Sequence, residues 1–202
     1  MFVTARKSPR QARSRATVEA IIEATAQVLV REGYDRFTTT RAAERAGVSI
    51  GSLYQYFPNK KALTCALIER CCGDFLRAFQ SAVADKATLS ECITALVEFA
   101  LGPERIPRDL HRTLNELTVT LGLSQQTQMV REAVTQAVEA LLRAHADEIA
   151  PEIDLPAAAR LIQTTLEALA HRALDPAQSQ AARDEPLIAE TKRMLESYLV
   201  RS

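Results

Sequence analysis

The chain has 202 residues, 47% of them hydrophobic, and a formal net charge of zero, so it is long enough for one large domain or two smaller ones with a packed core. No apolar run approaches the roughly 18 residues of a membrane span, and no apolar segment follows the basic N-terminus as it would in a secretory signal. The four cysteines show neither CxxC nor Cys/His metal spacing, so we expect a cytoplasmic protein with no metal site.

The zero net charge hides an asymmetry between the two parts of the chain. Residues 1–63 hold eleven Lys or Arg and five Asp or Glu, whereas residues 64–202 hold fourteen and twenty. A basic region beside an acidic one indicates that the basic region binds a polyanion. Chance clustering of charge is the alternative.

Helical periodicity begins close to the N-terminus. Residues 1–13 resemble a flexible basic arm. Apolar residues then recur at steps of three and four, which predicts a helix from Ser14 or Ala16 to Glu32. Gly33 is expected to end this helix, because glycine accepts the left-handed backbone of a C-terminal cap.

Two short helices are predicted next. The first begins near Thr39 or Thr40, where a threonine hydroxyl can accept a hydrogen bond from a free amide, and ends at Ala46–Gly47. Ser49 is the predicted N-cap of the second, which runs to about Tyr56.

The remaining chain is predicted to be helical as well. Asn59 can cap a fourth helix of more than twenty residues that ends near Val83 and would join two packing units. The further predicted helices span about residues 88–101, 107–121, 124–147, 154–169 and 186–200. The sequence contains no convincing strand or internal repeat, so the predicted fold is all-α with about nine helices.

The cysteines fit the same helical pattern. Cys65 and Cys72 share one face of the fourth helix with Ile68, Phe75 and Phe79, which favours burial as small apolar residues. A thiol-sensing role remains an alternative for the adjacent Cys71, which would be more exposed.

The stretch TTTRAAERAGVSIGSLYQYFPNKKAL, Thr38–Leu63, contains both short helices. Two short helices joined by a tight turn with glycine are typical of a helix-turn-helix, whose second helix enters the major groove of DNA. That helix needs small or polar residues on its leading face, and bulky Leu53 and Phe57 would face the core. Phosphate contacts, also from helix N-termini, would set its register. The candidate DNA-binding residues are Thr39, Thr40, Arg41, Ser49, Ile50, Gly51, Ser52, Tyr54, Gln55 and Lys60.

This stretch resembles the signature of the tetracycline-repressor (TetR) family of bacterial transcription regulators. The resemblance rests on a Thr pair, Ala-Gly-Val-Ser, Leu-Tyr-x-aromatic-Phe and a Lys before an apolar residue, and it extends over about residues 14–74. It implies a helix-turn-helix DNA-binding domain over residues 14–74, with the motif at about 38–57, and a ligand-binding and dimerisation domain over residues 75–202.

The resemblance also implies roles for individual residues. Thr39 and Thr40 would open the first motif helix against the DNA backbone, and Tyr54 and Lys60 would contact phosphates. Ile50, Gly51 and Ser52 would approach bases. Two departures matter: Ala42 replaces a larger aliphatic residue, and Ile50 offers no hydrogen bond, so it could read only a thymine methyl or DNA shape. Arg41, Ser49, Ser52 and Gln55 are then the candidates for direct contact with bases, with no order among them.

The C-terminal part is predicted to form a homodimer, because two modules related by a two-fold axis can read a pseudo-palindrome. Pairing the last two helices across that axis would make a four-helix interface. The candidate interface residues are Leu161, Thr165, Leu169, Leu187, Leu195 and Tyr198. The alternative is that both apolar stripes pack only within one chain.

The middle helices, residues 88–147, are predicted to surround a small-molecule inducer. Polar residues interrupt their apolar lining at His111, Asn115, Glu116, Thr118 and Thr120, which suits an orienting site in an apolar pocket. An ordinary amphipathic helix with a wet face explains the same pattern.

The predicted protein is a repressor that binds an operator in double-stranded DNA and is released by an inducer through a shift in population. A transcriptional activator of the same fold and a helical adaptor without DNA binding are the alternatives. No P-loop, GxGxxG, nucleophile elbow or metal-ligand cluster is present in the sequence, so we expect neither an enzyme nor a cofactor.

Overall fold

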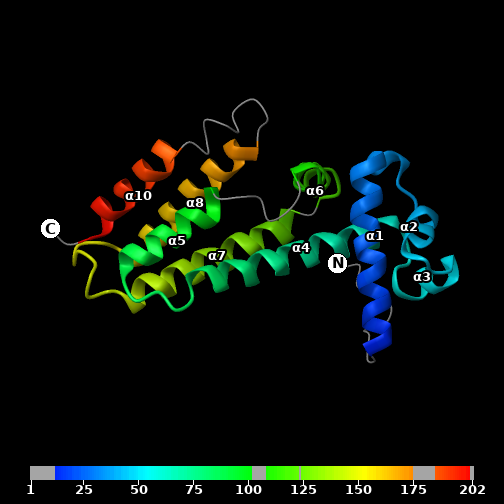
Figure 1. Cartoon of the computed structure of the whole chain (residues 1–202), viewed down its shortest axis with the longest axis horizontal. Coiled ribbons are helices and arrows are strands. Elements are labelled where there is room, and N and C mark those ends of the chain that lie inside the picture. Colours follow the sequence, from blue (N-terminus) through cyan, green and yellow to red (C-terminus); the bar gives the residue numbers. More distant parts are fainter. Residues whose placement is uncertain (1–11, 102–107, 123, 175–184, 201–202) are drawn as a thin grey trace. The chain divides into compact units, whose positions relative to one another are not determined.

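The computed structural model describes residues 12–101, 108–122, 124–174 and 185–200. Over these residues the protein contains nine helices and no β-strand (Figure 1), which confirms the all-α prediction. The helices are α1 (Ala12–Arg36), α2 (Thr39–Ala46), α3 (Ile50–Tyr56), α4 (Lys60–Val83), α5 (Leu89–Leu101), α6 (Arg108–Thr120), α7 (Ser124–Ala144), α8 (Leu155–Leu174) and α10 (Glu185–Leu199). Residues 1–11 of the predicted basic arm lie outside the described part of the chain.

The chain forms two compact units. The first comprises Met1–Gly73 and Ile106–Thr127, and the second comprises Asp74–Arg105 and Gln128–Ser202. In the first unit α1 packs against both α2 and α6, and α2 and α3 lie on the same side of α1 (Figure 1).

Helix α6 packs in a different unit from the one that its place in the sequence predicts. The sequence predicts that α6 belongs to the C-terminal domain, residues 75–202. The structure instead includes it in the first compact unit. Leu110, Leu114 and Leu117 are buried in the core of that unit, and their spacing of four and three residues makes one apolar stripe on α6. The first unit therefore draws its core from two separate segments of the chain.

The short helices of the first unit begin at capping side chains. The Arg41 amide donates to Thr38 Oγ1 over 3.2 Å, so Thr38, and not Thr39 or Thr40, caps α2. Ser49 caps α3 through a 3.1 Å bond from the Ser52 amide, as predicted. Asn59 caps α4 through a 2.8 Å bond from the Ala62 amide, also as predicted.

The end of α1 also differs from the prediction. Gly33 has φ 74° and ψ 167°, so it interrupts the helix as expected, but one further turn carries α1 to Arg36. This extra turn places Phe37, which is 1% exposed, in the core. The Phe37 amide closes the turn by donating to the Gly33 and Tyr34 carbonyls at 3.1 and 3.2 Å.

The second unit is built around α5, which packs against α8 and α10. Its core includes Leu96, Leu101, Ile162 and Leu199. Phe99 lies edge-on to Phe75 and Phe79, with ring centroids 5.2 and 5.3 Å apart. The end of α10 is held by a bond from the Ala150 amide to the Leu199 carbonyl over 2.9 Å, beside an isolated bridge between Ile149 and Val200.

A hydrogen-bond network, called the relay below, joins the start of α5 to the segment after α7 through Glu148, His145 and Cys92. The Leu89 amide donates to both carboxylate oxygens of Glu148, at 3.0 and 3.1 Å. His145 Nδ1 lies 2.9 Å from Glu148 Oε1, and its Nε2 lies 3.5 Å from Cys92 Sγ. These contacts place the His145 ring between the Glu148 carboxylate and the Cys92 thiol, and the donor and acceptor roles of its two nitrogens depend on the tautomer.

The surroundings of Cys92 disfavour the thiolate form of its side chain. Burial raises the pKa of Cys92, and the nearby carboxylates of Glu148 and Glu91 raise it further. A thiol whose pKa is raised stays protonated near neutral pH and is a poor nucleophile. Cys65 and Cys72 also have raised pKa values, with Cys72 at about 11, chiefly because they are buried. Burial of Cys65 agrees with the prediction for this face of α4, but Cys72 is only half-buried, like Cys71, and Phe75 is 38% exposed, so the prediction was wrong for Phe75.

We predict that Glu148→Ala lowers the free energy of unfolding by about 1 kcal/mol, the usual cost of losing a helix cap. The Leu89 amide and His145 would both lose their acceptor. Denaturant unfolding followed by circular dichroism measures the change, with Glu152→Ala as the control because Glu152 is exposed in the same loop. Equal stability of the two variants would show that the relay does not stabilise the fold.

Candidate nucleic-acid interface

The turn between α2 and α3 has the geometry of a helix-turn-helix. Gly47 adopts the left-handed conformation with φ 68° and ψ 28°, and its amide donates to the Glu44 carbonyl over 3.1 Å. The Val48 amide donates to the Ala43 carbonyl over 3.0 Å. These two bonds satisfy free carbonyls at the end of α2, and the left-handed Gly47 turns the chain toward the start of α3.

The inner face of α3 is fixed by burial. Leu53 is fully buried and Phe57, which caps the C-terminus of α3, is 2% exposed. Tyr56 OH lies 2.9 Å from Ser14 Oγ of α1, a hydrogen bond that sequence reasoning did not anticipate. Burial of Leu53 fixes which side of this seven-residue helix faces solvent.

The outer face of α3 carries the predicted DNA-binding residues. Gly51 and Gln55 are exposed, Ile50 is 38% exposed and Tyr54 is 43% exposed. Ser52 is half-buried. The structure therefore brings five of the predicted residues together on one small surface.

Two pairs of hydroxyls lie at this surface. Tyr54 OH is 3.1 Å from Thr39 Oγ1, which links α3 to the first turn of α2. Ser49 Oγ is 2.8 Å from Ser52 Oγ and also accepts from the Ser52 amide. Thr39 is 9% exposed, whereas Thr40 beside it is exposed. Each paired hydroxyl is held in position and keeps further capacity for a hydrogen bond.

Arg41 is bound to α1. Its Nη1 forms an ion pair with Glu32 Oε2. One turn further along α2, Arg45 Nε donates to Gln27 Oε1 over 2.7 Å. A hollow on the surface between α1 and α2 is lined by Gln27, Val28, Arg31, Glu32, Arg41, Glu44 and Arg45. A DNA contact by Arg41 would therefore have to compete with Glu32.

Lys60 is also bound within the chain. Its Nζ donates to the Tyr34 carbonyl over 2.6 Å and lies 3.9 Å from the centre of the Tyr34 ring. This contact joins the first turn of α4 to the connection between α1 and α2, and it combines a charge-assisted hydrogen bond with a cation–π contact. The sequence indicated a Lys at a phosphate-contacting position but gave no signal of this intramolecular partner.

The predicted ligand-pocket residues do not converge on the described surface hollows. Thr118 is 8% exposed and donates to the Leu114 carbonyl over 2.8 Å. Thr120 is exposed and donates to the Glu116 carbonyl over 2.8 Å. Glu116 is exposed and Asn115 is half-buried, while the side chain of His111 lies outside the described residues. The threonine hydroxyls are satisfied by their own helix.

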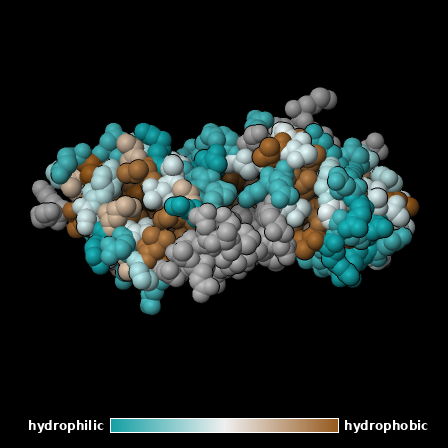
Figure 2. All heavy atoms as spheres, turned by 90° about the horizontal axis from the view of Figure 1, so that it is seen from above, coloured by the Kyte–Doolittle hydropathy of each residue, from teal (hydrophilic) through white to brown (hydrophobic). Residues whose placement is uncertain are grey.

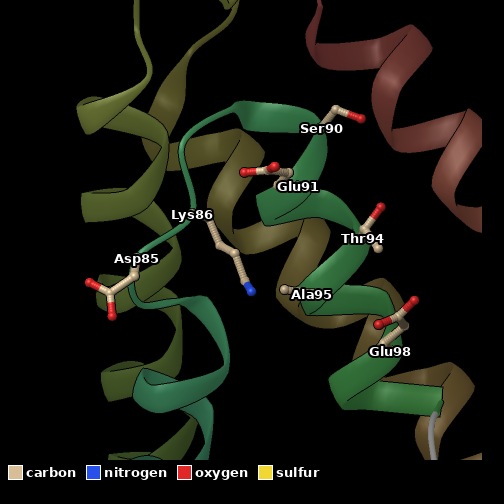
Figure 3. A pocket seen from close by; sticks show the side chains of 7 residues that line it. All are labelled: Asp85, Lys86, Ser90, Glu91, Thr94, Ala95 and Glu98. Carbon is tan, nitrogen blue, oxygen red and sulfur yellow. The ribbon is translucent and has the colours of Figure 1, made fainter.

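A hollow on the second unit has a different lining (Figure 3). Its residues are Asp85, Lys86, Ser90, Glu91, Thr94, Ala95 and Glu98. The Lys86 side chain extends toward Ala95 (Figure 3). Ser90 Oγ donates to Glu196 over 2.6 Å, and Lys192 Nζ donates to Glu98 over 2.9 Å. This polar hollow is bordered by the contacts that hold α10 on α5, and its lining is unlike an apolar ligand chamber.

The predicted dimer residues have different degrees of exposure. Leu161 is 50% exposed and Tyr198 is 36% exposed, while Thr165, Leu169 and Leu187 are half-buried. Leu195 is 2% exposed because it packs in the core of its own chain, so its assignment to an interface was wrong. Met194 beside it is 50% exposed. Figure 2 shows one face of the protein, where hydrophobic residues form small groups among hydrophilic ones.

Within the ranges that the structure describes, no cluster of three or more His, Cys, Asp or Glu could hold a metal ion. Among the helices described, none combines the length and apolarity needed to cross a bilayer.

The fold and this interface define a helix-turn-helix regulator that binds DNA. The family model described as "Bacterial regulatory proteins, tetR family" matches residues 21–67. The model described as "Tetracyclin repressor-like, C-terminal domain" matches residues 88–199. The second match alone spans more than half of the chain. The chain belongs to the tetR family of bacterial regulatory proteins, which confirms the resemblance noted in the sequence.

Solved structures share the whole fold. The fatty acid degradation regulator FadR from Bacillus halodurans superposes with a TM-score of 0.71 and 21% identity, covering 94% of this chain and 96% of its own. SmeT, the repressor of the Stenotrophomonas maltophilia multidrug efflux pump SmeDEF, gives a TM-score of 0.70 and 20% identity with 93% of each chain covered.

Curated relatives match over shorter segments. The fatty acid metabolism regulator protein of Bacillus subtilis is 30% identical over 77 residues, which are 38% of this chain and 40% of the relative. An HTH-type transcriptional regulator of Mycobacterium tuberculosis is 31% identical over 108 residues, 52% of this chain and 57% of the relative. The chain thus spans about half the length of the curated relatives it matches.

We predict that Lys60→Ala lowers the free energy of unfolding by about 1–2 kcal/mol, because a charge-assisted hydrogen bond and a cation–π contact are both lost. Thermal and denaturant melts measure the change. Lys61→Ala is the matched control, since Lys61 is the exposed next residue. If both variants unfold like the unmodified protein, the contact between Lys60 and Tyr34 does not hold α4 in place.

Proposed function

We propose that the protein is a transcriptional repressor that binds a pseudo-palindromic operator as a homodimer and is released by a small molecule. The observation that carries the proposal is the outer face of α3, where small and polar residues stand on a helix whose inner face is buried. The proposed place of action is the cytoplasm, and the proposed activity needs neither catalysis nor a cofactor.

The interface offers two kinds of DNA contact. The outer face of α3 fits the major groove, which admits one helix and presents the distinguishing edges of the base pairs. Thr39, Thr40 and Tyr54 lie beside it, and their hydroxyls suit phosphate oxygens that fix register and orientation. Lys60 holds α4 against Tyr34, and its phosphate contact stays a prediction.

The exposed apolar residues of α8 and α10 support a homodimer. Leu161, Met194 and Tyr198 are each at least 36% exposed on these two helices. Burying such residues between two copies would remove apolar surface from water. A symmetric pair would present two recognition helices to the two half-sites of a palindrome.

A small molecule would act by differential binding. An inducer releases the operator only if it binds the free dimer more tightly than the DNA-bound dimer, and such coupling is typically about 1–3 kcal/mol. Regulation by ligands is supported by a structural neighbour, SmeT, whose complex with triclosan has been solved. We propose that the second unit receives the ligand.

We predict that selection from a random pool of duplex DNA enriches a two-fold symmetric motif. Its half-sites would be centred about 10 base pairs, or a multiple of that, apart, because successive major grooves on one side of DNA repeat at that distance. Sequencing of the bound fraction measures the outcome. A pool that stays random after repeated rounds, with protein that is folded by circular dichroism, would refute sequence-specific binding.

We predict that Leu161→Arg converts the dimer into a monomer, since a buried unpaired charge disfavours association. Sedimentation equilibrium should give twice the 22.3 kDa chain mass for the unmodified protein and 22.3 kDa for the variant. Gln80→Arg is the control, because Gln80 is exposed on α4. A Leu161→Arg protein that still sediments as a dimer would place the interface elsewhere.

A further inference from the structure

Gly51 and Gln55 occupy the outermost line of α3. They are four residues apart and so lie on one face of the helix. Leu53, two residues from each, lies on the opposite face and is fully buried. Both Gly51 and Gln55 are exposed. A ligand that meets α3 from outside therefore meets these two residues first.

Gln55 differs from the other polar residues of this surface in its hydrogen bonds. Ser49 and Ser52 bond to each other, and Tyr54 bonds to Thr39. The Gln55 amide makes no hydrogen bond to the residues that the structure describes. Its carbonyl oxygen and its NH₂ group are thus both available, side by side in one plane.

Nothing within the chain requires glycine at position 51. Its φ is not positive, and a Cβ added there would meet only Ser49 Oγ, at an ordinary distance of 3.9 Å. Glycine weakens a helix relative to alanine because it loses more backbone freedom on folding. A glycine that the fold does not need, at the outermost position of an exposed helix, indicates close approach by a binding partner.

We propose that Gln55 determines the sequence specificity of this interface by reading the adenine of an A·T base pair, and that Gly51 allows α3 to come close enough for this contact. The inference rests on the proposed function, operator binding through α3. An adenine edge in the major groove presents the N6 donor beside the N7 acceptor, and the glutamine amide matches both in a bidentate pair. The serine, isoleucine and tyrosine side chains of α3 offer no such planar donor–acceptor pair.

The test uses the full-length protein and the duplex selected by the unmodified protein. Affinities are measured by fluorescence anisotropy for this duplex and for variants with each half-site base pair replaced in turn. One A·T position should discriminate by about 5- to 150-fold, as one bidentate contact does. Gln55→Ala should abolish discrimination at that position alone. Gln55→Glu should change the preferred base there to cytosine, whose N4 donor a carboxylate accepts.

Tyr54→Phe is the matched control on the same helix. It removes a hydroxyl assigned to phosphate, so affinity should fall by a similar factor for every duplex without a change in preference. Gln55→Ala acting in this uniform way would overturn the inference. A change of preference at a G·C position in place of an A·T position would overturn it as well.

Gly51→Ala tests the second half of the proposal. Its melting temperature should be equal to or above that of the unmodified protein, whereas its affinity for the selected duplex should fall about tenfold or more, since one added methyl prevents the close approach. Unchanged affinity would overturn the role of Gly51.

Operator binding through α3 and base reading by Gln55 can be refuted separately. If the unmodified protein selects no motif, operator binding through α3 fails. If it selects a motif and Gln55→Ala keeps the same preference at every position, operator binding stands and only the role of Gln55 is refuted.

Discussion

Burial of Leu53 and Phe57 is the constraint on which the interface depends. A helix of seven residues is too short to be stable alone, so α3 exists because these side chains enter a core built from α1, α2, α4 and α6. That burial also fixes the rotation of α3 about its axis. Once Leu53 points inward, Gly51 and Gln55 must point outward. The chemistry offered to a ligand therefore follows from packing on the other side of the helix.

Local sequence signals predicted the elements around this site. Ser49 and Asn59 were identified as caps and Gly47 as the turn residue, because each acts within three or four residues of its own position. The predicted start of α2 near Thr39 or Thr40 is confirmed, but the capping hydroxyl belongs to the preceding Thr38. Three consecutive threonines offer the same hydroxyl, and only backbone conformation distinguishes them.

Contacts between distant segments could not be predicted in the same way. The sequence gives no sign that Lys60 reaches the Tyr34 carbonyl, or that Glu148 supports the start of α5. The inclusion of α6 in the first unit also depends on tertiary packing. Similarly, the apolar stripe of α10 predicted Leu195 as an interface residue, but only the fold shows that it faces its own core and that Met194 faces outward.

The outer line of α3, formed by Gly51 and Gln55, is expected to touch DNA. A photocrosslinking amino acid at position 55 tests it most directly, with position 80 of α4 as the control because Gln80 is also exposed. Irradiation of each protein bound to its selected duplex should give covalent DNA adducts from position 55 and none from position 80. Adducts from position 80, with none from position 55, would contradict the claim.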